Sequence, residues 1–596
     1  MLPDTYYKQR LEQLQKRLSF LLEKKSHLAI SRFFVAAFLI AAIYFLWSHG
    51  LALTVAATII LLTVFIRLVF ADIDNKYAIQ HTRHLIKINE DELKALRHDY
   101  YHFKEGNEFK QAEHPYSNDL DIFGHASLFQ YINRTTSEMG AATLASWLLN
   151  VADVESIPER QVAIKELADK TKWKQELAAI GKEKGIHLYT KERLKEWLSE
   201  PNSFEKFKPW TWLRYLLPGI ILTVVILYFS DELSLQVFIY FLLAFMVIAY
   251  GIDRKVSPVH EQLSKMVGEL DVLSASIKLL EKTSFSSSLL LKMQQKYLSR
   301  NNKASAELKK IKNILERLDL RYNLVLAGPL SILLLWSLQQ ILSLEKWKDA
   351  NRENVIEWFD MLGVFEALNS LAILNFNHPE WSFPVLHDKH FHIDGKQVGH
   401  PLIHKSKRVN NNIKIERSGE LMLVTGSNMA GKSTYLRSIG TNIVLAMAGA
   451  PVCADYFILS PVTLVSSMRV ADNLEESTST FYAELKKLKT IIDKVNNREK
   501  VFILLDEILR GTNSLDRHTG SVALLKQLIR QDASGILATH DVELAKLKES
   551  YPDNILNYHF DAQVSNEELY FDYLLKPGIC TSLNASILMK KIGIDL

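Results

Sequence analysis

The stretch from Phe33 to Ile66 contains no Asp, Glu, Lys or Arg, and it constrains the fold more than any other feature of this sequence. A membrane-spanning helix needs about 20 predominantly apolar residues, so the stretch accommodates two short spans joined at Ser48-His49-Gly50. A second pair of apolar runs covers Tyr215–Ser230 and Leu233–Ile252, separated by two acidic residues. Core helices of soluble proteins usually keep one polar face, and these runs keep none. The sequence therefore predicts two membrane hairpins with about four spans.

Basic residues flank both hairpins, whereas the two tight connections contain no Lys or Arg. Because basic residues collect in cytoplasmic loops, we expect the connections to face outward and the rest of the chain to lie in the cytosol. The flanking residues are Lys24, Lys25 and Arg32 before the first hairpin, Lys206, Lys208 and Arg214 before the second, and Arg254 and Lys255 after it. This pattern predicts a multi-pass protein of the cytoplasmic (inner) membrane.

Composition excludes several other classes of protein. Hydrophobic residues make up 48% and charged residues 23%, which is too apolar for a disordered chain. Two cysteines exclude a disulfide framework and suit a reducing compartment. The formal net charge of +4 neither requires nor excludes a nucleic-acid partner.

The segment Gly426–Thr434 follows an apolar strand, precedes a helical pattern and fits G-x-x-x-x-G-K-S. This is the context of a P-loop, whose backbone amides close around phosphate oxygens. Lys432 would reach the β- and γ-phosphates of ATP, and the Ser433 hydroxyl would bind Mg²⁺. The predicted nucleotide-binding residues are Gly426, Ser427, Asn428, Met429, Ala430, Gly431, Lys432, Ser433 and Thr434.

Two carboxylates end a second apolar strand, Val501–Leu505. Asp506 would complete the Mg²⁺ site with Ser433, and Glu507 would act as the general base that polarises the attacking water. A third apolar strand ends at His540, which we interpret as a catalytic sensor of the γ-phosphate. The three elements together predict an ATP hydrolase that uses ATP and Mg²⁺, with its catalytic domain in the cytosol.

A fifth uncharged run, Tyr322–Leu344, bears on the number of spans. A fifth span would place the N-terminus and the nucleotide-binding domain on opposite sides of the membrane. Because both are predicted to be cytosolic, we expect this run to form a buried core helix.

Longer strings around the motifs resemble the MutS family of ABC-type ATPases. Thr425–Arg437 is similar to the family's TGPNMGGKSTYxR, and Asp506–Asp516 is similar to its DExGRGTSTxD. The likeness extends to Ser479-Thr480-Phe481 with Glu484, to Ala538–His540, to Tyr573–Cys580 and, upstream, to residues 127–149 and 157–167, which resemble the family's helical core. The apolar hairpins have no counterpart in the family.

The resemblance implies a dimer, in which each nucleotide lies between the P-loop of one subunit and the signature segment of the other. Ser479 would then approach the partner's γ-phosphate, and Asp516 would lie near the dimer seam. The sequence departs from the family pattern at Leu509, Ser427 and Asn513, where the family has glycine, proline and serine. These departures bear on the contact between subunits rather than on nucleotide binding.

The resemblance also implies DNA binding of the mismatch-repair type. Family members that detect mismatches carry an N-terminal reading domain with a Phe-x-Glu element, and residues 72–117 are too few for such a domain. Phe103-Lys104-Glu105 fits that three-letter pattern, and a chance match of this kind is expected in a chain with 28 Phe. The second hairpin falls where the family's levers and DNA clamp are expected, so we hypothesise that the hairpin replaces the clamp.

The expected architecture is multidomain, with a helical membrane-inserted core and lever region followed by a C-terminal α/β P-loop ATPase domain. We divide the chain into an amphipathic helix (1–30), a first transmembrane hairpin (31–71), a helical linker (72–117), a helical core in two parts (118–208 and 253–390) around the second transmembrane hairpin (209–252), and the ATPase domain (391–596).

Three functions remain open. The favoured one is a membrane-anchored, dimeric MutS-like ATPase that binds mismatched DNA as an ATP-dependent clamp or lever. The alternative is an ATP-driven switch or scaffold that acts on a membrane partner without DNA. An ABC transporter is the third, and it is disfavoured because the spans carry almost no polar side chains that could line a path.

Overall fold

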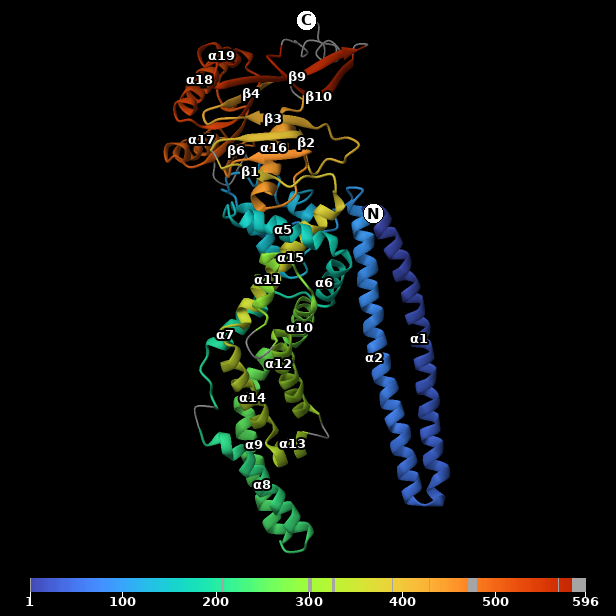
Figure 1. The fold of residues 1–596 in the computed structure, drawn as a ribbon. Coiled ribbons are helices and arrows are strands. Elements are labelled where there is room, and N and C mark those ends of the chain that lie inside the picture. Colours follow the sequence, from blue (N-terminus) through green and yellow to red (C-terminus); the bar gives the residue numbers. More distant parts are fainter. Residues whose placement is uncertain are drawn as a thin grey trace. The chain divides into compact units, whose positions relative to one another are not determined.

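The structure, a computed structural model, describes residues 2–204, 208–298, 303–323, 327–388, 390–427, 429–469, 480–565 and 568–580. The chain divides into two compact units. Unit 1 comprises residues 1–90, 135–140 and 172–366, and unit 2 comprises residues 91–134, 141–171 and 367–596. Unit 1 is helical, and unit 2 carries the two β-sheets (Figure 1). The predicted combination of a helical region with a C-terminal α/β domain is therefore confirmed.

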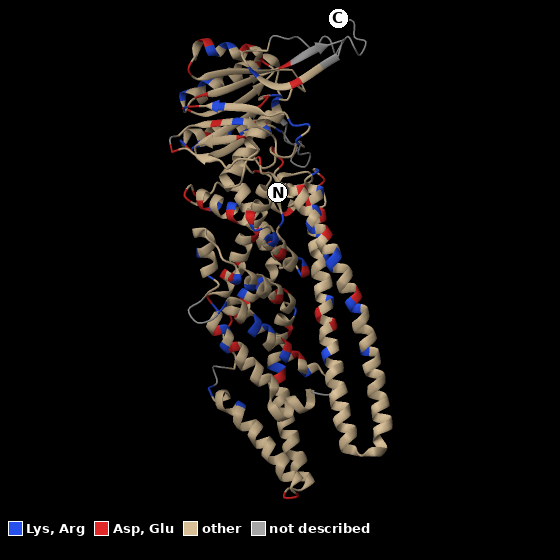
Figure 2. Ribbon diagram, turned by 45° about the vertical axis from the view of Figure 1, so that its right-hand side comes forward, with Lys and Arg blue, Asp and Glu red and all other residues tan. Residues whose placement is uncertain are grey.

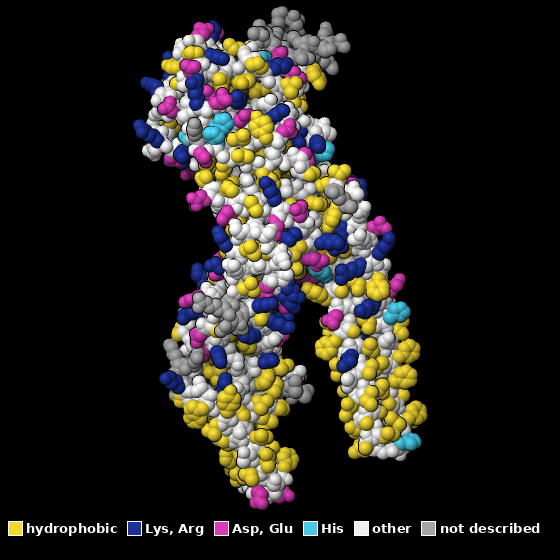
Figure 3. Space-filling view, viewed as in Figure 1, with side chains coloured by type: hydrophobic (Ala, Val, Ile, Leu, Met, Phe, Trp, Pro, Cys, Tyr) yellow, Lys and Arg dark blue, Asp and Glu magenta, His cyan; other side chains and the backbone are white. Residues whose placement is uncertain are grey.

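Unit 1 begins with a long helical hairpin. α1 (Pro3–Leu46) and α2 (Leu51–Ala95) are joined by the short helix η1 (Trp47–His49) and Gly50. α1 continues without a break through the boundary expected after residue 30, and α2 continues through the one expected after residue 71. In the half next to the connection, charged residues are nearly absent and apolar side chains cover the surface (Figures 2 and 3). The most exposed are Phe33, Phe38, Ile40, Tyr44, Phe45, Trp47, Leu51, Ile60 and Phe70.

The opposite half of this hairpin is a packed two-helix seam. Tyr7, Leu14 and Leu21 are buried at seven-residue spacing, as at one seam position of a coiled coil. Between the two halves, Arg32 Nη1 lies 3.1 Å from Asp72 Oδ2, and the Asp72 side chain is only 2% exposed. The seam ends against α6 (Thr171–Glu183), which contributes two alanines to the same apolar cluster as Leu14.

A second hairpin is formed by α8 (Trp210–Phe229) and α9 (Leu235–Ser264). Ile221, Val224 and Phe245 are buried between its helices. Its outer surface is apolar, and acidic residues occur at its tip (Figures 2 and 3). Both pairs of apolar runs in the sequence therefore form helical hairpins whose apolar side chains face outward.

The run Tyr322–Leu344 differs from its expected form. It contains two helices, α13 (Ala327–Leu334) and α14 (Trp336–Asn351), bent by 71° at Leu335, whose φ is 45°. No residue of α13 is buried, and Ile332 and Leu333 pack against the core of the α8–α9 hairpin. The expectation of one buried core helix is thus wrong for the first half. It holds for α14, because most of that helix is buried.

The remaining helices of unit 1 pack around α10 (Val267–Lys282) and α12 (Ala304–Asp319), which lie against each other. Burial of the apolar stripe of α12 explains this pairing, because Leu308, Ile311 and Leu315 recur at helical spacing. The others are α7 (Leu188–Ser199), α11 (Ser288–Gln295) and η3 (Leu320–Tyr322).

By length and composition, five helices of the described residues could each cross a membrane, or six elements if α13 and α14 together form one. Four are α1, α2, α8 and α9, whose most apolar windows are at most 17% buried. The fifth, α15 (Val355–Asn377), has 72% of its window buried, so its apolar residues belong to the protein interior.

The larger sheet of unit 2 has six strands in the order β10-β9-β4-β8-β7-β6. All neighbouring pairs are parallel except β9 with β10. β4, β7 and β8 are buried along their whole length, as in a parallel sheet covered on both faces. The bounds are β4 Leu421–Thr425, β6 Thr463–Ser467, β7 Val501–Asp506, β8 Ser534–Thr539, β9 Ile555–Ser565 and β10 Glu568–Pro577.

A smaller sheet, β1-β5-β2-β3, precedes and interrupts the larger one in sequence. Its strands are β1 (Val385–Leu386), β2 (Ile393–Val398), β3 (Asn411–Ile415) and β5 (Tyr456–Leu459). The other helices that contribute to unit 2 are η2 (Asn107–Phe109), α3 (Leu128–Ile132), α4 (Glu138–Leu149), α5 (Ser156–Asp169), α16 (Lys432–Ala448), α17 (Thr480–Asn496), α18 (Ser514–Arg530), η4 (Val542–Lys546) and α19 (Leu547–Ser550).

The seam of the first hairpin yields a stability prediction. Leu14 is 1% exposed and Leu22, on the same helix, is 39% exposed. We expect Leu14→Ala to cost about 2–5 kcal/mol, because it leaves a cavity, and Leu22→Ala to change stability by about 0.5 kcal/mol or less. Thermal unfolding of the purified variants, followed by helical circular dichroism, measures both. Equal melting temperatures for the two variants would show that Leu14 is not packed in the seam.

Candidate nucleotide-binding site

The site begins in the loop between β4 and α16. Gly426 and Gly431 have φ values of 153° and 103°, which L side chains rarely adopt, so the two glycines let the loop turn tightly. Lys432, the first residue of α16, donates hydrogen bonds from Nζ to the carbonyl oxygens of Gly426, at 2.9 Å, and Ser427, at 3.0 Å. Burial lowers the pKa of Lys432. The lysine thus folds back over its own loop.

The first turn of α16 presents the rest of the predicted phosphate contacts. Ser433 and Thr434 are exposed there, and Met429 is 81% exposed at the tip of the loop, whereas Ala430 is buried. Exposed hydroxyls and amides at a helix N-terminus suit an anion. Two predicted residues, Asn428 and Ser479, lie outside the described residues.

The parallel register brings the other predicted groups to the same edge of the sheet. Thr425 pairs with Thr539, and Asp506 pairs with Ala538, so the strands β4, β8 and β7 end side by side. Glu507 follows directly and donates its backbone N–H to the Ala538 carbonyl at 2.9 Å. Ligands of open α/β sheets bind at this carboxyl edge.

Glu507 and His540 form an ion pair at the centre of this edge, with 2.5 Å between Oε1 and Nε2. The hydrogen bond from His540 holds the pKa of Glu507 below its usual value. The other Glu507 oxygen lies 3.2 Å from Arg510 Nε, and His540 Nε2 lies 3.3 Å from Lys432 Nζ. The predicted lysine, base and sensor therefore gather at one point.

Two buried oxygens at this edge, Oδ1 of Asp506 and Oγ of Ser427, have no hydrogen-bond partner among the residues that the structure describes. The Asp506 side chain is nearly enclosed, and an unpaired carboxylate oxygen is costly to bury without a compensating group. A hard cation beside Asp506 and Ser433 would satisfy it, since Mg²⁺ prefers oxygen ligands. The residues present therefore fit the predicted Mg²⁺ site.

A cavity of about 420 Å³ opens beside the loop. The loop and the start of α16 form part of its lining, and the rest combines apolar, aromatic and polar side chains. The apolar and aromatic ones are Val398, Ile403, Val409, Phe560 and Tyr573, and Lys407 and Asn411 are polar. A flat heterocycle such as a nucleobase suits an apolar slot of this kind. The sequence did not indicate these residues, because they come from three separate segments and share no local motif.

Comparison with known proteins places this domain. Residues 422–590, which include the loop, both carboxylates and His540, match the family model for MutS domain V. This C-terminal part of the chain is related to the MutS family. Similar proteins include MutS protein homolog 4 of Homo sapiens, 33% identical over 208 residues (32% of this chain, 21% of that protein), and DNA mismatch repair protein MutS of Persephonella marina, 30% identical over 237 residues (39% and 27%). These matches span only about a fifth to a quarter of the relatives' own lengths.

Leu509, which departs from the MutS pattern, has an unusual backbone conformation. Its φ is 59°, in the left-handed region where glycine is favoured and where another L-residue costs about 1–2 kcal/mol. The Glu484 carboxylate of α17 accepts the backbone N–H groups of Leu509 and Arg510, the latter at 3.2 Å. The Leu509 side chain is 9% exposed and belongs to the core of the domain. Hydrogen bonds and apolar packing thus hold the strained loop after Glu507.

The departure at Asn513 preserves a helix cap. Its Oδ1 accepts the N–H of Asp516 at 2.9 Å, and its Nδ2 donates to Asp516 Oδ2 at 2.7 Å. Asparagine caps helices as well as serine does, so α18 begins as the family pattern requires. Asp516, predicted to lie near the dimer seam, is exposed in the first turn of this helix.

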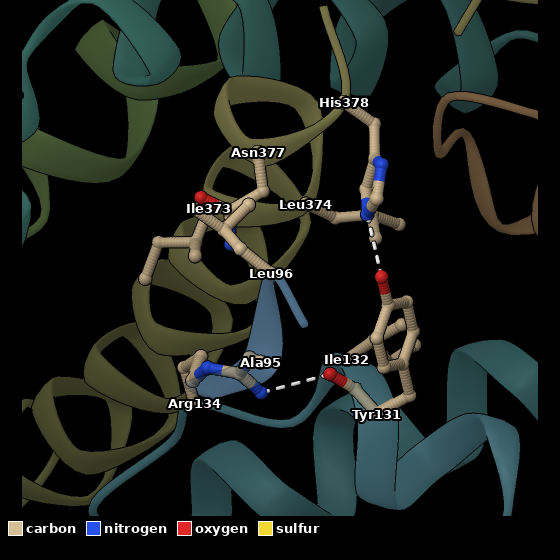
Figure 4. A pocket seen from close by; sticks show the side chains of 9 residues that line it. All are labelled: Ala95, Leu96, Tyr131, Ile132, Arg134, Ile373, Leu374, Asn377 and His378. Carbon is tan, nitrogen blue, oxygen red and sulfur yellow. Dashed lines mark hydrogen bonds between the residues drawn. The ribbon is translucent and has the colours of Figure 1, made fainter. Parts of the chain in front are cut away.

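A small cavity elsewhere in unit 2 is closed by polar contacts (Figure 4). Tyr131 Oη lies 2.6 Å from His378 Nε2, and Arg134 Nη1 donates to the Tyr131 carbonyl at 2.8 Å. Its volume of about 10 Å³ holds at most one water molecule. The Arg134 guanidinium also covers the Phe103 ring at 3.7 Å, so the Phe-x-Glu match is part of this packing.

The contact between Leu509 and α18 predicts that one substitution changes stability in opposite directions in two backgrounds. A Cβ added at Gly520 would lie 2.5 Å from Leu509 Cδ1. We expect Gly520→Ala to destabilise the native chain by about 1–3 kcal/mol through overpacking. In a Leu509→Ala background the same change should stabilise by about 0.5–1 kcal/mol, because alanine is the better helix former. Denaturant unfolding of the four variants measures the coupling, and the same sign in both backgrounds would refute the contact.

Proposed function

We propose that this MutS-related protein is an ATP hydrolase that works as a dimer at the cytoplasmic membrane. The convergence of Lys432, Asp506, Glu507 and His540 at one edge of the domain V sheet carries this proposal. Lys432 begins the helix that follows β4, Asp506 and Glu507 lie at the end of β7, and His540 follows β8. Their chemistry matches the needs of phosphoanhydride hydrolysis.

The roles follow from the charges. Lys432 would leave the carbonyl oxygens of its loop and hold the β- and γ-phosphates, and Ser433 and Asp506 would hold Mg²⁺. ATP supplies the phosphoanhydride bond, and Mg²⁺ supplies positive charge beside the phosphates. Glu507 is kept anionic by His540, so it can accept a proton from the attacking water. His540, 3.3 Å from Lys432, is placed to report the occupancy of the phosphate site.

Dimerisation is proposed from the family resemblance. Ser479 would complete the nucleotide site of the partner, and Asp516 would lie close to the seam. Ser433 and Thr434 are exposed among the described residues, which is compatible with a contribution from a partner subunit at this point.

Membrane insertion is proposed from the two hairpins. Their apolar surfaces would be costly in water, at about 25 cal/mol for each Å², and their connections carry no Lys or Arg. The flanking basic residues favour an orientation with the domain V in the cytosol.

Two outputs of the ATPase are compatible with these features. Similarity to a DNA mismatch repair protein favours an ATP-dependent clamp or lever on DNA. The position of the α8–α9 hairpin within the helical region favours instead a lever that acts on a membrane partner. An ABC transporter is less well supported, since the outer surfaces of the hairpins are apolar.

The catalytic assignment predicts two distinct defects. Lys432→Ala should weaken nucleotide binding about ten- to hundredfold, because a charge-assisted contact is lost. Glu507→Gln should bind ATP normally and lower the hydrolysis rate by about 10²–10⁴-fold. Nucleotide affinity and phosphate release are measured on the detergent-purified chain, with the exposed Lys526→Ala as the control. Turnover of Glu507→Gln at the parent rate would show that another group is the base.

The two outputs are separated by the response of the ATPase to DNA. A DNA lever should be stimulated by duplex or mismatched DNA, and the stimulation should fade as salt rises, because phosphate contacts release counterions. A lever on a membrane partner should keep the same rate with and without DNA. The measurement is the hydrolysis rate at two salt concentrations, with and without duplex, mismatched and branched DNA.

A further inference from the structure

An apolar groove runs between α8 and α13 in unit 1. Its volume is about 350 Å³, and almost all of its surface is carbon. Apolar side chains cover the surface of the second hairpin, to which one of its walls belongs (Figure 3). The lining residues are Pro218, Gly219 and Leu222 on one wall, and Pro329, Leu330, Leu333 and Leu334 on the other.

An Arg–Tyr pair precedes each wall in sequence. Arg214 lies over the ring of Tyr215, 4.5 Å from its centroid, and Arg321 lies over the ring of Tyr322, at 4.7 Å. Both tyrosines are 64% exposed. Tyrosine collects at the boundary between lipid and water, where its ring is apolar and its hydroxyl is wet. The two pairs therefore mark the polar end of the groove.

Neither guanidinium has a counter-charge among the described residues. No carboxylate lies within ion-pair distance of Arg214 or Arg321, and Nε of Arg214 and both Nε and Nη1 of Arg321 are buried without a hydrogen-bond partner. Nη2 of Arg214 donates to the Tyr215 hydroxyl, and Nη2 of Arg321 reaches the Tyr322 hydroxyl at 2.6 Å and His260 Nδ1 at 3.1 Å. The other nitrogen of His260, Nε2, lies 2.9 Å from Asp319 Oδ1, so this carboxylate reaches Arg321 only through the imidazole. The corresponding arginine of the first hairpin, Arg32, is neutralised by Asp72.

The first turn of α14 holds the backbone at Arg214 and, one helical turn before Arg321, at Arg317. Gln339 Nε2 donates to the Arg214 carbonyl at 2.5 Å, and Trp336 Nε1 donates to the Arg317 carbonyl at 2.6 Å, one helical turn before Arg321. On α8, residues 214, 218 and 222 follow each other at four-residue intervals, so the arginine and the groove share one face of the helix. A half-buried cationic end thus continues into an apolar slot.

We propose that this groove binds an anionic phospholipid, with its phosphate between Arg214 and Arg321 and one acyl chain along α8 and α13. The proposal rests on the proposed membrane insertion. The apolar slot favours a lipid over free phosphate, which has no apolar part. The uncompensated guanidinium groups favour an anionic headgroup over a zwitterionic one, since an anionic lipid supplies the net charge that the protein lacks there. In this arrangement α13 is a short helix held at the membrane surface by the lipid that it covers.

The test uses full-length protein purified from membranes in detergent. Phosphatidylglycerol and phosphatidylcholine carrying the same fluorescent acyl chain are titrated against the native chain and against Arg214→Gln/Arg321→Gln. The matched control is Arg254→Gln/Lys255→Gln, which removes the same charge from exposed positions of α9. We expect the native chain and the control to prefer phosphatidylglycerol, and the site variant to bind it about tenfold or more weakly.

A second variant tests the slot independently. Leu330→Trp fills the groove and should weaken binding of both lipids without changing the headgroup charge. Thermal unfolding followed by helical circular dichroism shows that each variant is folded. The proposal is wrong if both charge variants lose affinity equally, if the native chain binds the two lipids alike, or if inorganic phosphate at millimolar concentration displaces the lipid from the site.

Carbonate extraction of membranes separates this proposal from the proposed function. A chain released by carbonate is not inserted, and both proposals then fail. A chain that resists carbonate and shows no preference for the anionic lipid overturns the lipid site alone.

Discussion

The parallel register of β4, β8 and β7 is the constraint on which the candidate site depends. Parallel strands end at the same edge, so the residues that follow Thr425, Asp506 and Thr539 meet there although they are far apart in sequence. The buried strands fix the position of the backbone, so the side chains that directly follow these strands are also held in fixed positions. Strain at Leu509 persists for the same reason, because the core and Glu484 hold the loop from both sides.

The helical unit follows a different constraint, the separation of charged from apolar surface along each hairpin. In the first hairpin the transition coincides with the Arg32–Asp72 pair, which neutralises itself. In the second hairpin the transition coincides with two arginines that form no ion pair with the described residues. The proposed membrane insertion would place both transitions near the lipid headgroups. The arginine of the first hairpin is already neutralised there, whereas the two arginines of the second would pair with an anionic headgroup.

The sequence predicted those parts of the fold and of the site whose residues lie within one continuous segment. The glycines and Lys432 of the phosphate loop, the carboxylates after β7 and the helical hairpins each occupy one continuous segment. The prediction was wrong for the first half of Tyr322–Leu344, since mean apolarity does not indicate a bend at a residue with positive φ such as Leu335. The apolar lining with Val398 and Phe560 was missed because it is assembled by the fold from distant segments. The contact of Leu509 with Gly520 was also beyond the sequence, which indicated only that Leu509 replaces a glycine.

The hydrogen bonds that Lys432 makes to its own loop affect which ligands the site would bind. Lys432 already has two carbonyl partners, and Glu507 already has His540, so an arriving anion must replace existing bonds rather than fill vacant ones. A small anion such as inorganic phosphate offers few contacts in exchange, whereas a nucleoside triphosphate adds the apolar slot beside the loop. If the site binds ATP as proposed, ligands that engage only the phosphate end would bind more weakly than ATP.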